Sequence, residues 1–223
     1  MDQLSLPDMP APMRRALVPR GWAAGLSRGD VQAAVDAAGW KGIVLPYTRM
    51  SDYYGFPVIS WSVGARERFR FGPGPVLVRP ALVLWERWPL GVSSLPPPSP
   101  IDIVGWVSVS TWRPAMRATC ALAAKGSMMI LTPKRPSMLR LCEADCAGIH
   151  VVQMGGDGDC EVLVQGRFGP VETARRTTNI RYWEEALFAH ALASWREDGV
   201  IPPGLLPGQT KGETFRTDSS PAV

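Results

Sequence analysis

Four side chains able to bind a metal ion follow one another in a short stretch of the chain: Cys142, Cys146, His150 and Cys160. Zinc prefers four nitrogen or sulfur ligands, commonly from closely spaced cysteine pairs. Cys142 and Cys146 are four residues apart, so on a helix both sulfurs would lie on one side. His150, however, alternates with apolar neighbours on a predicted strand and should point away from them. We therefore expect small buried thiols and a solvent-facing histidine, and we predict no metal site and no cofactor.

A second candidate chemistry is phosphate recognition by arginines near aromatic residues. Arg66, Arg68 and Arg70 alternate, so on a strand they would share one face. Arg87 lies between two tryptophans. The planar guanidinium binds phosphate oxygens in a bidentate way, and aromatic rings stack on bases. These four arginines are the candidate nucleic-acid contacts; the alternative is that the first three form the solvated side of a hairpin.

The distribution of charge agrees with this placement. Residues 1–100 contain 11 Lys and Arg against 7 Asp and Glu, whereas residues 101–223 contain 13 of each. The net charge of +4 is modest for a dedicated nucleic-acid-binding protein, and a GC-rich genome would also favour arginine over lysine. We expect DNA or RNA to bind through the first half of the chain.

Paired carboxylates that hold magnesium are the third candidate. Glu86, near the end of a predicted strand, and Asp102, at the start of the next, are the two weak candidates for a catalytic pair. Neither His150 nor His190 stands in a pattern typical of a nucleophile–histidine pair.

Alternating strands and helices are predicted for the second half of the chain, where apolar β-branched runs indicate strands and a proline in the first turn favours a helix start. The expected elements are strand 101–111, helix 113–124, strand 127–132, helix 136–146, strand 148–153 with its hairpin partner 160–165, and helix 178–197. This order predicts an α/β protein with a mixed β-sheet flanked by helices.

The first half is less regular. Ser27 and Asp30 are expected to cap a helix over 27–38. Apolar runs predict strands at 42–46, 56–63 and 75–88, the last broken by Pro80, and a proline-rich loop over 89–100. Composition predicts a flexible leader over 1–13, a single α/β domain over 14–198 and a disordered Pro/Gly-rich tail over 199–223.

The stretch 102–152 resembles the core of the restriction-endonuclease-like, PD-(D/E)XK superfamily. Its members have a strand with Val-Glu-x-Lys, a tryptophan four residues later, a helix, a strand ending near a proline, a short helix and a further strand. This chain has Trp112, a helix with Ala115 and Met116, the strand Met128–Pro133, a helix over 137–146, and a strand opening at Gly148. The resemblance implies a restriction-endonuclease-like core.

The departures fall on the catalytic positions. Ser108 stands where the superfamily has its lysine, Trp106 where it has glutamate, and Ala118 where it has glutamine. Trp106 and Ser108 can neither hold magnesium nor activate water. The resemblance therefore implies a nuclease-like fold without nuclease chemistry, and Trp106 is also what a central strand would carry in a core.

Composition excludes several other classes. The chain has 223 residues, of which 46% are hydrophobic, so it is neither disordered nor a short disulfide scaffold. No apolar run is long enough to span a membrane and no secretory signal is visible, so we expect a cytoplasmic protein. Our prediction is a non-catalytic protein that binds nucleic acid. The alternatives are a diverged magnesium-dependent nuclease using Glu86 and Asp102, or an adaptor whose nine tryptophans contact a protein partner or a second copy.

Overall fold

The computed structural model describes residues 19–89, 95–156 and 158–198. The predicted leader 1–13 and tail 199–223 lie outside the described residues, as does the start of the predicted domain at 14–18. The four cysteines are all free, so no disulfide contributes to the fold. In the described part of the chain, no helix has the length and apolar character needed to cross a membrane.

The centre of the molecule is a mixed seven-stranded sheet. Its order is β1-β3-β4-β5-β6-β7, and β2 pairs with β3 alone. The strands are β1 (Ile43–Val44), β2 (Thr48–Met50), β3 (Tyr53–Trp61), β4 (Ile101–Ser108), β5 (Ser127–Thr132), β6 (His150–Met154) and β7 (Cys160–Val164). Strands β4, β5 and β6 are parallel, while β3 and β7 run antiparallel to their neighbours. The predicted α/β class with a mixed sheet is confirmed.

The parallel strands are joined by helices, as parallel neighbours require. α4 (Trp112–Leu122) connects β4 to β5, and α5 (Met138–Cys146) connects β5 to β6. A tight turn in which the Gly155 N–H donates to the Asp159 carbonyl joins β6 to β7. The elements predicted between 101 and 165 are therefore confirmed, with ends that differ by a few residues.

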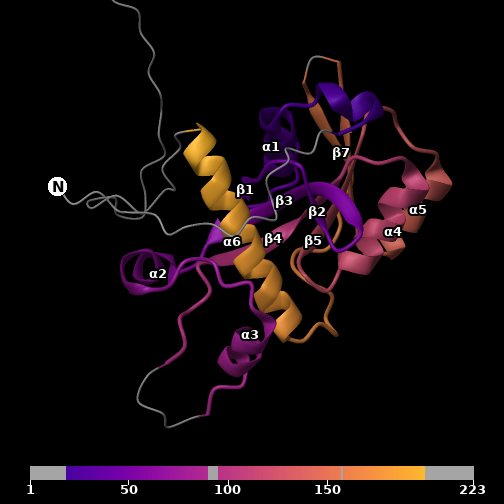
Figure 1. Cartoon of the computed structure of the whole chain (residues 1–223). Helices are drawn as coiled ribbons and strands as arrows, with labels where there is room; N and C mark the ends of the chain where they lie inside the picture. Colours follow the sequence, from indigo (N-terminus) through magenta and orange to yellow (C-terminus); the bar gives the residue numbers. More distant parts are fainter. Residues whose placement is uncertain (1–18, 90–94, 157, 199–223) are drawn as a thin grey trace, which may run out of the picture.

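Two apolar cores cover the two faces of the sheet. One face packs against α4, α5 and the long C-terminal α6 (Thr178–Asp198), through side chains such as Leu122, Leu141 and Leu187. The other face packs against α1 (Arg28–Ala37), which follows the short 3-10 helix η2 (Gly21–Gly25). Figure 1 shows α6 crossing in front of the sheet, with α4 and α5 together beside it. β5 is buried along nearly its whole length because helices cover both of its faces.

The predicted start of α1 is confirmed in detail. The Ser27 side chain accepts a hydrogen bond from the Asp30 N–H at 3.1 Å, and the Asp30 carboxylate accepts one from the Ser27 N–H at 2.8 Å. This reciprocal capping box satisfies two backbone donors that a helix start leaves without partners.

The segment between β3 and β4, residues 62–100, corrects the strand prediction for 75–88. It contains α2 (Ala65–Phe71) and α3 (Arg79–Glu86), with Pro80 in the first turn of α3. Pro80 lacks only a backbone donor that a first turn does not use, so it starts a helix rather than breaking a strand. Leu82 is fully buried where α3 packs against α6. We call this segment the β3–β4 insertion; Figure 1 shows α2 and α3 apart from α4 and α5.

Candidate nucleic-acid interface

The arginines at 66, 68 and 70 lie on helix α2, not on a strand. On a helix, residues four apart share a face and the residue midway between them points the other way. Arg66 and Arg70 are accordingly exposed, whereas Arg68 is buried. The prediction that all three line one face is wrong, but Arg66 and Arg70 still do.

Arg68 is a structural residue of the β3–β4 insertion. Its side chain is fully buried, and its Nη1 and Nη2 donate to the two carboxylate oxygens of Glu185 at 3.0 and 2.8 Å. The remaining N–H groups donate to the carbonyls of Pro73, Gly74 and Pro98. All five donors of the guanidinium are therefore used, and none is available to a phosphate.

Glu185 of α6 is the centre of this buried network. Besides Arg68, it accepts a hydrogen bond from the Val76 N–H at 3.0 Å and pairs with Arg181 at 3.1 Å. Burial lowers the pKa of Arg181, although Glu185 opposes that shift. The Trp85 ring lies 5.5 Å from the Arg68 guanidinium and 5.4 Å from that of Arg181. One carboxylate thus fixes α2, the linker to α3 and the proline-rich loop against α6.

The exposed arginines of the insertion have no such partners. Arg66, Arg70 and Arg87 form no ion pair with any carboxylate among the residues the structure describes. Arg79, which the sequence analysis missed, is also exposed, and its guanidinium lies 5.1 Å from the centre of the Tyr182 ring. The proline at the second position of α3 was the available signal, because it places Arg79 in the first turn of a helix. The described part of the insertion therefore presents four exposed arginines around the buried Arg68–Glu185 network.

Glu86 and Asp102, the two candidate catalytic carboxylates, lie near an ion-pair cluster. Arg176 donates to Glu86 at 2.9 Å and to Glu184 at 2.9 Å, and these bonds, first that to Glu184, raise its pKa. Partial burial raises the pKa of Asp102, with Glu184 adding repulsion and Arg176 opposing it. The Arg176 guanidinium is the cation that pairs with Glu86 and Glu184. In the described residues, no group of three or more His, Cys, Asp or Glu side chains is arranged to hold a metal ion.

The positions where nuclease chemistry would be expected are core positions. Trp106 is 1% exposed and Ser108 is fully buried. A side chain on Gly55 of β3 would come within 2.6 Å of the Trp106 indole nitrogen, so glycine leaves room for the ring. Asp102 is six residues before Ser108 on β4, about 20 Å away along the strand. Asp102 and Ser108 are therefore at opposite ends of β4, and Glu86 lies outside this strand, at the end of α3.

The cysteine and histidine positions reverse our expectation. Cys142 and Cys146 are exposed, and His150 is fully buried. The Trp40 indole N–H donates to His150 Nε2 at 3.3 Å, and the Arg167 carbonyl lies 3.1 Å from the same nitrogen. Alternation along β6 did place His150 opposite to its neighbours, but helix α1 and Phe168 cover that face too. Burial lowers the pKa of His150.

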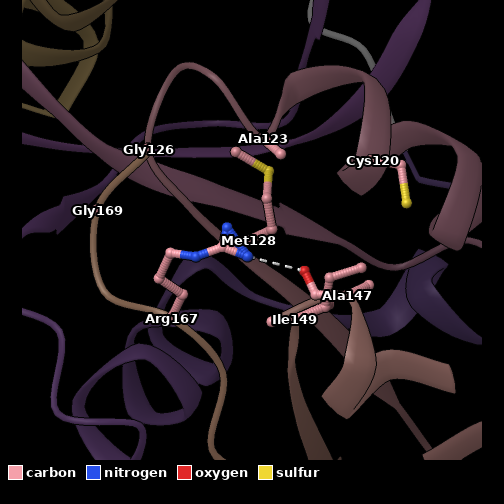
Figure 2. Close-up of a pocket in the computed structure, with 9 residues that line it drawn as sticks. Cys120, Ala123, Gly126, Met128, Ala147, Ile149, Arg167 and Gly169 are labelled. Carbon is pink, nitrogen blue, oxygen red and sulfur yellow. Dashed lines mark hydrogen bonds between the residues drawn. The ribbon is translucent and has the colours of Figure 1, made fainter. Parts of the chain in front are cut away.

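A small cavity lies between the ends of α4 and α5 and the segment after β7 (Figure 2). Arg167 crosses it and donates to the Ala147 carbonyl at 3.1 Å, with Met128 alongside. The cavity volume is about 20 Å³, which is room for about one water molecule. This cavity is too small for a substrate.

No known protein family, curated protein or solved structure matches this chain.

Proposed function

We propose that this protein binds nucleic acid without cleaving it, on a restriction-endonuclease-like core whose catalytic positions have become part of the hydrophobic core. The contacts are the exposed arginines of the β3–β4 insertion: Arg66, Arg70, Arg79 and Arg87. The observation that carries the proposal is that Arg66, Arg70 and Arg87 lack carboxylate partners among the described residues. By contrast, the neighbouring Arg68 is buried, and its guanidinium is hydrogen-bonded to both carboxylate oxygens of Glu185.

Rigid support favours a binding role. An exposed arginine on a mobile loop loses conformational freedom when it meets a phosphate, and that loss weakens binding. Here α2 and the start of α3 are fixed through Glu185, which accepts hydrogen bonds from Arg68 and from the Val76 N–H. The backbone carrying the arginines is therefore preorganised, and only their side chains need to be ordered on binding.

The order of elements supports the resemblance to the nuclease-like core. β4, α4, β5, α5 and β6 occupy the positions that the resemblance implies for its strand–helix–strand–helix–strand unit. The buried Trp106 and Ser108 support the loss of catalysis, because neither side chain is ionised and neither reaches solvent.

The test is fluorescence anisotropy with labelled duplex and single-stranded oligonucleotides over a range of salt, with magnesium present. Each phosphate contact to duplex DNA contributes about 0.9 to the slope of log affinity against log salt. The double variant Arg66→Ala/Arg70→Ala should therefore lower that slope by about two. Arg117→Ala, which removes an exposed arginine from α4, is the matched control and should leave the slope unchanged.

Three outcomes would overturn the proposal. Absence of binding at low salt would remove nucleic acid as the partner. A double variant with the slope of the wild type would place the contacts elsewhere. Magnesium-dependent cleavage that is lost in Asp102→Asn would establish the diverged nuclease instead.

A protein partner is the second candidate function, because α3 also exposes apolar side chains. Val83 and Leu84 of α3 are 38 and 56% exposed, and Val78, the residue just before the helix, is 61% exposed. Exposed apolar residues grouped on one short helix are typical of a contact surface. Oligomerisation in analytical ultracentrifugation that is abolished by Leu84→Glu, without any nucleic-acid affinity, would support this candidate.

A further inference from the structure

Three aromatic rings rise from the core to the surface at the β2–β3 hairpin. Phe56 is 3% exposed, and its ring centre lies 5.1 Å from that of Tyr47. The Tyr47 ring is in turn stacked with that of Tyr54 at 6.3 Å, with only 22° between the ring planes. Tyr54 is 42% exposed and forms the outer end of this column. The aromatic column thus ends in a ring that is supported on its inner side.

The hairpin holds Tyr54 in a fixed position. Tyr54 pairs with Arg49 across β2 and β3, and the two strands are joined by a turn in which Ser51 has a positive φ of 56°. Arg49 donates to the Ser51 carbonyl and to the Asp52 carboxylate. Its guanidinium carbon is 5.9 Å from the centre of the Tyr54 ring, near the outer limit of a cation–π contact.

The surroundings favour an anionic ligand with a flat ring. The Arg49 guanidinium lies over the Tyr54 ring, near the outer limit of contact, and Arg20 is close enough to Tyr47 to act on it electrostatically. Asp52 is the neighbouring carboxylate and is paired with Arg49. Burial raises the pKa of Tyr47. An exposed aromatic ring beside cations is the arrangement on which unpaired nucleobases stack.

We infer that Tyr54, supported by Tyr47, is a stacking site for an unpaired base of a single-stranded nucleic acid. This inference rests on the proposed function and refines it, because it names the unpaired base as the feature recognised. A base inside a duplex has both faces covered by its neighbours and offers none to Tyr54.

The stacking site is separate from the arginines of the insertion. Tyr54 is seven residues before Trp61, or about 23 Å along β3, and α2 with Arg66 and Arg70 begins only after that end of the strand. The two sites can therefore be altered independently. Loss of the arginines should weaken binding of every nucleic acid, whereas loss of Tyr54 should weaken binding of single strands only.

The experiment compares Tyr54→Ala and Tyr54→Phe with the wild-type chain. The probes are an unstructured single-stranded DNA, RNA of the same sequence, a duplex, and the DNA strand with abasic positions in place of its bases. Stacking on an aromatic side chain contributes about 1–3 kcal/mol per base, so Tyr54→Ala should weaken single-strand binding by roughly 5- to 160-fold. Tyr54→Phe keeps the ring and should stay within about twofold of the wild type. Neither variant should change binding of the duplex or the abasic strand.

Leu139→Ala, which removes an 80% exposed apolar side chain from α5, is the control and should leave all affinities unchanged. Circular dichroism establishes that each variant is folded. Several results would overturn the inference: single-strand affinity unchanged in Tyr54→Ala, an equal loss for duplex and single strand, or a Tyr54→Phe variant as weak as Tyr54→Ala. If Tyr54→Ala is neutral while Arg66→Ala/Arg70→Ala weakens binding, only this inference fails. If the wild type binds no probe, the proposed function fails with it.

Discussion

The parallel half of the sheet and the β3–β4 insertion are stabilised by different interactions. Between 101 and 154, buried side chains pack against helices on both faces, with Leu131 and Val152 on the α1 side and Ile130 on the side of α4, α5 and α6. The insertion contains, in addition to apolar contacts, a buried charge network centred on the Glu185 carboxylate, which meets two arginines and a backbone N–H. Apolar packing tolerates small adjustments, but a buried charge tolerates the loss of its partner poorly.

Because of this difference, the two regions have different structural roles. The sheet provides the overall stability of the chain. The Glu185 network determines where α2 and α3 lie, and so where Arg66 and Arg70 are presented. A variant that releases the insertion should therefore weaken nucleic-acid binding while leaving the sheet folded.

The largest expected effect is that of Glu185→Ala. The substitution leaves Arg68 and Arg181 buried without a counter-charge, which typically costs about 3–5 kcal/mol. Because these arginines contact residues of the insertion, we expect protease cleavage to appear first between 62 and 100. Limited proteolysis with mass spectrometry, together with urea unfolding, measures both effects.

Glu161→Ala is the matched control, because its ion pair with Arg135 is more than half exposed on both sides. An exposed pair of this kind contributes about 0–1 kcal/mol. Equal losses for the two variants would show that the buried network does not hold the insertion.

The second effect tests the sheet. Leu131→Ala removes a fully buried side chain of β5 and should cost about 2–5 kcal/mol. In contrast to Glu185→Ala, it should lower the urea midpoint for every probe of the sheet together, without early cleavage in the insertion. Leu139→Ala, at an 80% exposed position on α5, should leave the midpoint nearly unchanged. Early cleavage in Leu131→Ala would mean that the two regions are not separable.

The same contrast explains which parts of the fold were predictable. In the parallel half, each strand is an apolar run bounded by turn residues, so local pattern and tertiary structure agree. In the insertion, residues such as Val78 and Val83 favour strands locally, yet contact with α6 selects a helix. That partner lies about a hundred residues later in the sequence, beyond the reach of a local pattern.

The residues of the candidate site also differ in whether a local pattern could place them. Arg66 and Arg70 share a face on a strand and on a helix alike, because residues four apart lie on the same side of either element. The placement of these two arginines on one face therefore did not depend on the element predicted. Arg68 was misplaced because its burial depends on Glu185, which no local pattern links to it. Tyr54 and Tyr47 were not predicted as a site, because the pairing of the short strand β2 with β3 brings their rings together and β2 itself was not predicted.

The smallest effect is a dependence of stability on pH from His150. Its pKa is lowered by burial, so the folded chain binds its proton less readily than the unfolded chain does. Stability from this group is therefore complete above the unfolded value of about 6.5 and is lost as the pH falls from there toward the lowered folded value. The urea midpoint should decrease between pH 8 and pH 5.5, a range in which most carboxylates remain ionised.

His150 belongs to the sheet, which makes this effect a second test of the contrast between the regions. Its ring contacts Trp40 and Phe168 and makes no contact with the insertion in the described structure. Acidification should therefore destabilise the sheet as a whole, and the order of cleavage sites should stay as it is at pH 8. His150→Gln removes the titrating group and should flatten the pH dependence. An unchanged slope in His150→Gln would mean that other groups produce the effect, since no proton could then be taken up at this position.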